Sequence, residues 1–411
     1  MTGPRDTTKD APREADAAME VSRTGKRVAL ATLCATQITS WGVLYYAFPV
    51  LAGDITVATG WSTAAITGAL SASQLVAALV GIPVGRWIDR HGPRAVMTAG
   101  SILGVPAVVL VATAQNLMWF LAAWLVAGMA MGAVLYPPAF AALTRWHGPD
   151  PVRALTILTL AGGLASTVFA PLTAALAAHL DWRTTYLVLA AILAVVTIPA
   201  HWFGLRQPWP PRPAPGHMDT DPQHTARSRT FIVLAVALSL AALATFAAVI
   251  NLVPLLTERG ISIGVASVAL GLGGAGQIVG RLGYAAIVRH TTVLTRTVAI
   301  VAALAVTTAA LGLLTTALAL TLGAVVAGMA RGVFTLLQAT AVTDRWGRRY
   351  YGHLTGLLSA PMTITMALAP FTGAALAGWL GSYHTTFLFL GALAAVAAAL
   401  SLLTLPRPAD A

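Results

Sequence analysis

Residues 126–146 read VAGMAMGAVLYPPAFAALTRW, and residues 326–346 read VAGMARGVFTLLQATAVTDRW. The second stretch follows the first at a distance of 200 positions, and ten of the 21 aligned residues are identical. Other pairs keep this spacing to within one residue, among them Pro171 with Pro370. An internal repeat of this length predicts that the chain consists of two homologous halves.

The amino-acid composition indicates whether these halves are surrounded by water or by lipid. Apolar residues make up 57% of the sequence and charged residues only 9%, with a mean hydropathy of +0.77. A soluble domain has about 25% charged residues, so water is not the main solvent of this chain. A helix needs about 20 apolar residues to cross a membrane. Twelve apolar runs have this length: 28–50, 63–84, 95–114, 118–143, 154–178, 184–204, 230–256, 264–287, 297–316, 318–343, 354–380 and 385–405.

The runs fall into two groups of six. They predict an all-α polytopic membrane protein, with twelve transmembrane helices arranged as two pseudo-symmetric six-helix bundles. Between the groups lies a polar, proline-rich stretch around Trp209 that cannot be embedded in a membrane. The expected order is a cytoplasmic disordered tail (1–27), an N-terminal bundle (28–204), a cytoplasmic linker (205–229), a C-terminal bundle (230–405) and a cytoplasmic tail (406–411).

The distribution of the basic residues along the chain explains why a membrane protein carries a net charge of +11. With the N-terminus inside the cell, 21 of the 25 Lys and Arg residues fall in segments on the cytoplasmic side. This bias follows the positive-inside rule and places both termini in the cytoplasm. We therefore expect a multi-pass protein of the cell membrane, whose partner is the lipid bilayer and not nucleic acid.

A charged turn follows the second apolar run and reads GRWIDRHGPR from Gly85 to Arg94. Gly85 permits a close approach of two helices, and Gly92 permits a tight turn. Arg90 and Arg94 suit the anionic surface of the cytoplasmic leaflet. The spacing G-x-x-x-D-R-x-G-x-R, with Asp89 as its acid, is too complete for an ordinary basic loop.

This turn and the two-half repeat resemble the major facilitator superfamily, whose signature has the same spacing. The resemblance implies a transporter whose halves rock about a central substrate site. It also implies that Gly85, Asp89, Arg90, Gly92 and Arg94 form a conformational signature. In that signature Asp89 would contact the cytoplasmic end of the eleventh helix, in the other half, and hold the outward-facing state until the contact is broken.

Catalysis is not expected from this sequence. A membrane enzyme needs converging carboxylates, histidines or an activated nucleophile. All 14 acids are expected in tails, loops or the linker, where they assemble no catalytic or metal-binding group. Residues 271–276 spell G-x-G-x-x-G, but inside an apolar run with no strand before it. No enzymatic activity, cofactor or metal is therefore expected.

Two arginines remain at membrane depth, Arg281 in the eighth run and Arg331 in the tenth. A guanidinium there costs about 2.5–3.5 kcal/mol on insertion scales, so it needs a partner. An anionic substrate is the natural counter-ion, because a guanidinium binds a carboxylate through two parallel hydrogen bonds. The alternatives are an Arg281 that reaches the cytoplasmic side and a polar helix interface around Arg331.

The segment around Arg281 is similar to the monocarboxylate and oxalate/formate branch of the superfamily, whose eighth helix carries D-x-x-x-R. Gln277 takes the place of the acid here. The fifth-helix signature of the branch is matched at Arg153 and Leu155 but not at Thr156. The resemblance implies that Arg281 contacts a substrate carboxylate, with Gln277 beside it. Loss of the acid favours exchange or facilitated diffusion of an anion over proton coupling.

Further candidates for substrate contact are polar or aromatic residues at membrane depth. Gln37, Trp41 and Tyr45 share one face of the first helix, at positions i, i+4 and i+8. Tyr136 on the fourth helix and Asn251 on the seventh are placed similarly. For the aromatic residues, helix packing is an alternative interpretation of the same pattern.

The expected function is secondary active or facilitative transport of a small organic anion, such as a monocarboxylate, by a monomer that works through alternating access. The alternative is efflux of a drug-like or secondary metabolite, because apolar cavities with few polar groups suit such substrates. Drug antiporters of the superfamily carry an arginine on helix four, where this chain has Met131. A receptor or scaffold would need an ordered soluble domain, which the sequence does not predict.

Overall fold

The computed structural model describes residues 21–148, 150–211 and 221–404, and the regular elements in this part of the chain are all helices. The first half contains α2 (Arg23–Trp41), the π-helix η1 (Gly42–Tyr46), α3 (Ala47–Thr59), α4 (Thr63–His91), α5 (Pro93–Ala112), α6 (Leu117–Val134), α7 (Tyr136–His147), α8 (Val152–Gly163), α9 (Ala165–Ala177) and α10 (Trp182–Gly204). The second half contains α11 (Pro222–Arg227), α12 (Arg229–Ile250), α13 (Leu252–Glu258), α14 (Ile263–His290), α15 (Val293–Leu313), α16 (Ala317–Thr340), α17 (Thr343–Trp346), α18 (Tyr351–Leu380) and α19 (Tyr383–Ser401).

Twelve helical spans in the described residues are long and apolar enough to cross a membrane. The predicted fold class is therefore confirmed. One expectation about position is wrong: the residues from Gly85 to Asp89 lie inside α4 and not in a turn, because α4 continues to His91. Asp89 is consequently a buried acid within a helix, although all acids were expected in tails, loops or the linker. Asp54 in α3, Glu258 in α13 and Asp344 in α17 also lie within helices.

Local sequence sets the helix ends. Ser62, Asn116 and Ser382 precede α4, α6 and α19, and each side chain accepts a hydrogen bond from a backbone N–H of the first turn. Gly92 has a φ of 82°, which only glycine adopts without strain, and Pro93 follows as the first residue of α5. This pair explains how the chain reverses direction within a single residue.

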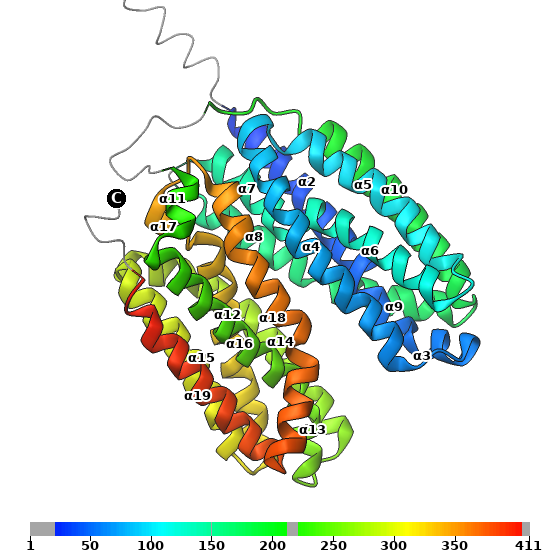
Figure 1. Ribbon diagram of the computed structural model, residues 1–411, viewed down its shortest axis with the longest axis vertical. Coiled ribbons are helices and arrows are strands. Elements are labelled where there is room, and N and C mark those ends of the chain that lie inside the picture. The colour runs from blue at the N-terminus through cyan, green and yellow to red at the C-terminus, as the bar shows by residue number, and fades with distance from the viewer. Residues whose placement is uncertain (1–20, 149, 212–220, 405–411) are drawn as a thin grey trace, which may run out of the picture.

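The two halves form two bundles with the same internal packing (Figure 1). In the first half α4 packs on α6 and α5 packs on α10. In the second half the equivalent helices repeat both pairings, α14 on α16 and α15 on α19. The structure thus reproduces in space the repeat that the sequence shows.

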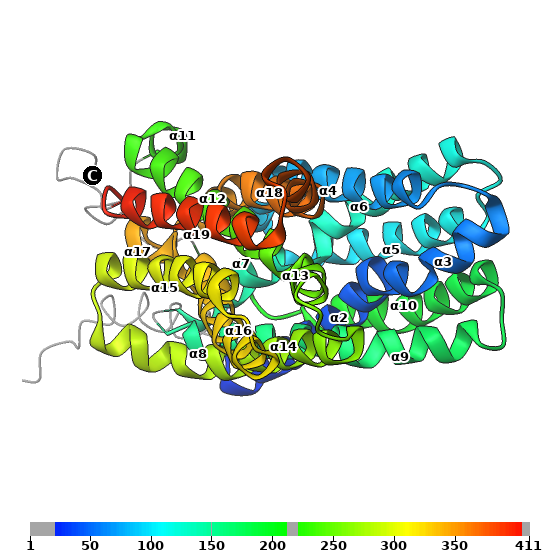
Figure 2. The same ribbon diagram turned by 90° about the horizontal axis from the view of Figure 1, so that it is seen from below.

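Helix α18 joins the halves by packing on α4 and α7, and α8 does so by packing on α14 and α16. Figure 2 shows them on opposite faces of the molecule. A Cβ atom at Gly85 on α4 would overlap the carbonyl oxygen of Gly352 on α18, so only glycine allows these backbones to meet. The bundles converge at the end that carries Gly92, which we call the signature end, and diverge towards α3 and α13 (Figure 1).

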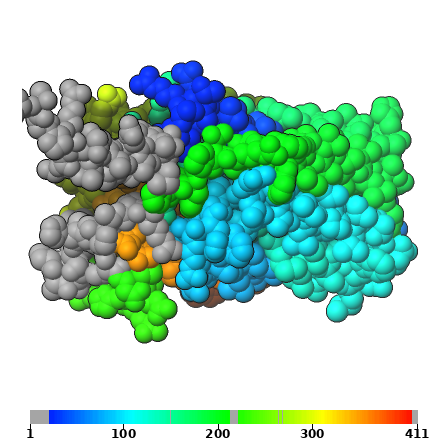
Figure 3. Space-filling model, turned by 90° about the horizontal axis from the view of Figure 1, so that it is seen from above, coloured from blue at the N-terminus to red at the C-terminus, as the bar shows by residue number. Residues whose placement is uncertain are grey.

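The segment after α10 lies against the signature end of the first half (Figure 3). Trp209 packs edge-to-face on Trp146, with ring centroids 5.7 Å apart, and the Trp146 indole donates to the Pro208 carbonyl at 3.1 Å. The linker expected at 205–229 therefore contains packed residues and a helix, α11. Residues 1–20, 212–220 and 405–411, which include most of the expected tails, lie outside the described residues.

Candidate functional site

Arg281 lies on α14 at the boundary between the halves, where it is 6% exposed. Its Nη1 donates a hydrogen bond of 2.6 Å to the carbonyl oxygen of Thr159 on α8, in the other half. Its Nε finds no acceptor among the described residues. A buried guanidinium held mainly by one neutral carbonyl keeps donors available for an anion.

Two glycines at the end of α8 make room for this contact. A Cβ atom at Gly163 would lie 2.7 Å from Arg281 Nη1, and one at Gly162 would overlap the hydroxyl of Tyr136. That hydroxyl lies 3.5 Å from the Thr159 carbonyl oxygen, the same acceptor that Arg281 uses. The glycine pair therefore lets Arg281 and Tyr136, from different halves, converge on one backbone carbonyl.

Gln277 lies one turn before Arg281 on α14 and beside Arg331 on α16. One end of its amide is 3.5 Å from Arg281 Nη2. The other end faces Arg331, which has only donors, so this end is assigned as the oxygen; it accepts from Nη2 at 2.9 Å and from Nε at 3.2 Å. The structure thus brings three of the expected site residues together in one polar cluster.

Aromatic side chains of the first half form a wall beside this cluster. Trp41 packs on Tyr45 and on Tyr136, with ring centroids 5.5 and 5.2 Å apart. Tyr46 packs on Tyr45 at 5.3 Å. Tyr46 and Tyr136 are within electrostatic range of Arg281, and all four residues are partly exposed. We call Trp41, Tyr45, Tyr46 and Tyr136 the aromatic wall.

The sequence pattern did not indicate Tyr46, because it assumes a regular helix. The first span contains the π-helix η1, and a π turn holds more residues than an α turn. The wider turn shifts the side chains that follow Trp41 around the helix axis, so that Tyr46 as well as Tyr45 belongs to the aromatic wall. Gly42 begins η1 where a Cβ atom would overlap the Phe169 ring, so a small residue is required there.

Gln37 is 0% exposed and contacts Trp41 of the aromatic wall. Its Nε2 donates to the carbonyl oxygen of Val134 at 2.6 Å, and its Oε1 accepts from the Trp41 indole at 3.2 Å. In a regular helix the Val134 carbonyl would accept from residue 138, but Pro138 has no N–H. Gln37 supplies the missing donor, so these contacts favour a positioning role over the substrate contact expected for it.

Asn251 occupies the junction between α12 and α13. Its Nδ2 donates to the Ala247 carbonyl at 2.9 Å and lies against Gly373 on α18, where a Cβ atom would overlap it. This amide nitrogen is engaged in helix packing. Substrate contact by Asn251, expected from the sequence, finds no support in these contacts.

Asp89 joins the halves at the signature end. Its carboxylate accepts the backbone N–H groups of Gly352 at 2.9 Å and His353 at 2.8 Å, at the start of α18. Arg86 Nε donates to Nδ1 of His353 at 2.9 Å. We call these contacts of Arg86, Asp89, Gly352 and His353 the latch.

The other residues of the conformational signature lie around the latch. Arg94 donates to the carbonyl oxygen of Trp202 on α10 at 2.9 Å and stacks on its ring, whereas Arg90 is exposed. Arg145 on α7 donates to the Asp89 carbonyl oxygen at 3.3 Å and to that of Pro211 at 3.5 Å. Arg145 therefore links the latch to the segment after α10, a role that sequence reasoning missed.

Residues 30–359 match the sequence profile of the Major Facilitator Superfamily. The chain belongs to this superfamily. It is therefore a transporter and not an enzyme, a multi-pass membrane protein that binds a small-molecule substrate. The match is to the superfamily as a whole, so the monocarboxylate and oxalate/formate branch stays a prediction.

Individual relatives agree with this membership. The chain is 27% identical over 148 residues to the uncharacterized MFS-type transporter YcxA of Bacillus subtilis (strain 168), a match that spans 35% of each protein. A single-residue variant of the E. coli fucose:proton symporter FucP has a similar fold, with a TM-score of 0.72 and 13% identity over 93% of this chain and 100% of that one. The human organic anion transporter MFSD10 (TETRAN) gives a TM-score of 0.70 and 17% identity over 92% of this chain and 99% of that one.

Proposed function

We propose that this superfamily member carries a small organic anion, such as a monocarboxylate, across the cell membrane as a monomer by alternating access. The observation that supports the proposal is the position of Arg281, a buried guanidinium at the boundary between the halves. Its hydrogen-bond acceptor there is the Thr159 carbonyl, which is neutral, and the Gln277 amide beside it carries no charge either. A carboxylate would give it charge-assisted hydrogen bonds, which are about twice as strong as neutral ones.

Substrate binding at this position would also affect the boundary itself. Arg281 Nη1 now ties α14 to α8 through Thr159. A carboxylate that takes over this donor would release the tie, so that binding is coupled to movement of one half relative to the other. A ligand can shift such an equilibrium only through differential contacts with the two states, and the exchange of Thr159 for substrate is a contact of this kind.

We place the signature end, with both termini, in the cytoplasm. Basic residues concentrate there, and the positive-inside rule assigns the more basic face to the cytoplasmic side. The latch closes this cytoplasmic end. In this orientation the structure therefore corresponds to the outward-facing state of the transporter. Exchange or facilitated diffusion fits better than proton coupling, because an amide, Gln277, stands beside Arg281 where a carboxyl group could have carried a proton.

Counterflow of radiolabelled carboxylates into proteoliposomes tests the proposal, with Arg281→Gln compared with wild type. Arg289→Gln is the matched control, because Arg289 is exposed on the same helix. We expect carboxylate uptake that Arg281→Gln abolishes and Arg289→Gln retains, with no dependence on a pH gradient. Equal uptake by wild type and Arg281→Gln would show that Arg281 does not bind the transported anion.

The second candidate is efflux of a drug-like metabolite, and the aromatic wall is the observation that favours it. Four partly exposed aromatic residues suit a large apolar substrate. In the same proteoliposomes, movement of cationic or neutral aromatic compounds, without any movement of carboxylates, would support efflux and assign Arg281 to the contact between the halves.

A further inference from the structure

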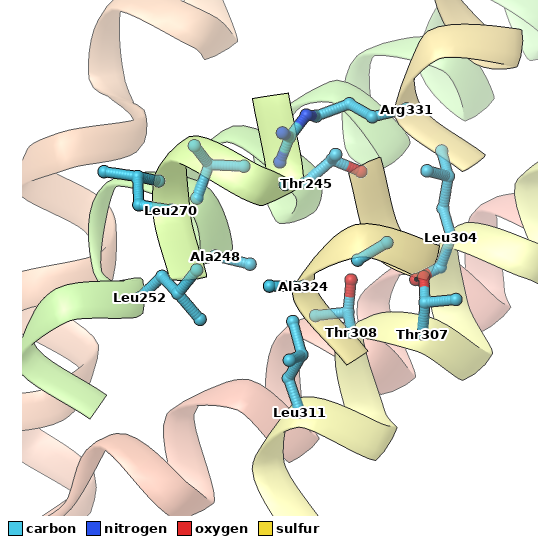
Figure 4. A pocket seen from close by; sticks show the side chains of 13 residues that line it. Thr245, Ala248, Leu252, Leu270, Leu304, Thr307, Thr308, Leu311, Ala324 and Arg331 are labelled. Carbon is cyan, nitrogen blue, oxygen red and sulfur yellow. Dashed lines mark hydrogen bonds between the residues drawn. The ribbon is translucent and has the colours of Figure 1, made fainter. Parts of the chain in front are cut away.

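A small cavity lies inside the second half, apart from the boundary between the halves. Residues of α12, α13, α14, α15 and α16 line it, and its volume is about 20 Å³ (Figure 4). A volume of this size holds one water molecule or an ion only slightly larger. The walls are apolar except for Arg331, Thr245, Thr307 and Thr308.

Arg331 supplies the positive charge of this cavity. It is 8% exposed, and its side chain extends along the cavity towards Thr245 (Figure 4). Nε and Nη2 are directed to Gln277, which leaves Nη1 donors free of any hydrogen bond within the described residues. The cavity-lining residues include no carboxylate, and the same-sign charge of Arg281 is close enough to act on Arg331. A buried charge in such surroundings is strongly stabilised by a counter-ion.

Hydroxyl groups supply the remaining donors. Thr245 is 4% exposed, and its Oγ1 has no hydrogen-bond partner among the described residues. Thr308 is also buried and lines the same space. Thr307 differs from both, because its Oγ1 donates to the Ala303 carbonyl at 2.7 Å. A hydroxyl rotates to donate to an anion, so Arg331 and Thr245 can converge on one small ligand.

We propose that this cavity is a binding site for a small inorganic anion of the size of chloride, held by the guanidinium of Arg331 and the hydroxyls of Thr245 and Thr308. The size of the cavity selects a single-atom ion over a carboxylate. The bound anion neutralises Arg331, and so keeps Gln277 in place beside Arg281. We thus assign Arg331 to this cavity and not to the proposed substrate site, whose ligand Arg281 is not among the lining residues.

Thermal unfolding of the purified full-length protein tests the site, in sodium chloride and in sodium gluconate at equal ionic strength. A ligand that binds only the folded state raises the midpoint as its concentration exceeds Kd. We expect a saturable rise with chloride and bromide that Thr245→Val removes and Thr307→Val retains. The same midpoint in chloride and gluconate would overturn the proposal, and so would an equal rise with formate, which would assign the cavity to carboxylates.

A second measurement does not depend on any variant. Crystals of the wild-type protein grown in sodium bromide should show an anomalous peak between Arg331 and Thr245, and a cavity without one at high bromide contradicts the site. Arg281→Gln separates this inference from the proposed function. We expect this variant to lose carboxylate transport and to keep the chloride-dependent rise, so each proposal can fail without the other.

Discussion

The carboxylate of Asp89 accepts the backbone N–H of His353 at 2.8 Å across the boundary between the halves. The neighbouring N–H of Gly352 donates to the other carboxylate oxygen at 2.9 Å. Both N–H groups belong to the first turn of α18, where a helix has no acceptor of its own and carries the positive end of its dipole. An acid of the first half thus caps a helix of the second half, and only while the signature end is closed.

We expect Asp89→Asn to weaken this closure. An amide offers one neutral acceptor in place of a carboxylate, and hydrogen bonds to charged groups contribute about 1.5–3 kcal/mol, so the closed population should fall relative to the open one by about tenfold or more. Spin labels at Arg206 and His290, one on each half near this end, would report it as longer distances in a Cys34→Ser background. Asp54→Asn, at an exposed carboxylate of α3, is the control and should leave the distances unchanged.

His353 should contribute to the latch through its side chain as well as its backbone. His353→Leu removes the acceptor of the Arg86 hydrogen bond but leaves the backbone N–H groups for Asp89. We therefore expect a smaller opening than in Asp89→Asn, measured with the same labels. In a double-mutant cycle with Arg86→Met, the two changes should be non-additive, since each removes the same bond. Additive effects would show that the bond does not contribute.

The sequence predicted the helices and the signature from short-range patterns, whereas the contact of Asp89 with the eleventh helix was expected only from the resemblance to the superfamily. Apolar runs of about 20 residues determine the spans, and the spacing from Gly85 to Arg94 marks the signature. The contact of Arg281 with Thr159 is different: it joins residues 122 positions apart, and neither helix pattern contains information about the other. A single sequence therefore identified the arginine but not its partner in the other half.

The sequence indicated two other contacts only in part. Pro138 shows in the sequence that the Val134 carbonyl lacks its helical donor, but only the structure shows that Gln37 supplies one. Trp209 was interpreted as part of a polar linker because prolines surround it. In the structure its ring covers Trp146 and fills the space beside Gly92, where a Cβ atom would lie 3.2 Å from it.

Gly163→Ala should impair substrate handling without unfolding the protein. The added methyl group would lie 2.7 Å from Arg281 Nη1, the flexible end of a long side chain, so the guanidinium would move away from Thr159. We expect a severalfold change in the KM for the transported carboxylate, with a small change in the unfolding midpoint. Gly283→Ala on α14 is the control, because nothing lies within 4 Å of its Cβ position. Matching KM values for the two variants would argue against Arg281 as the substrate ligand.

Gln37→Leu distinguishes a positioning role from substrate contact. The substitution leaves the Val134 carbonyl buried without a donor where Pro138 cannot provide one, and an unsatisfied buried group costs about 1–3 kcal/mol. We expect the unfolding midpoint to fall in detergent, whether or not substrate is present. Gln37→Glu is the complementary variant, because it keeps the acceptor for the Trp41 indole and, when ionised, loses the donor to Val134. If both variants keep the wild-type midpoint and raise KM instead, Gln37 contacts the substrate and its bond to Val134 is incidental.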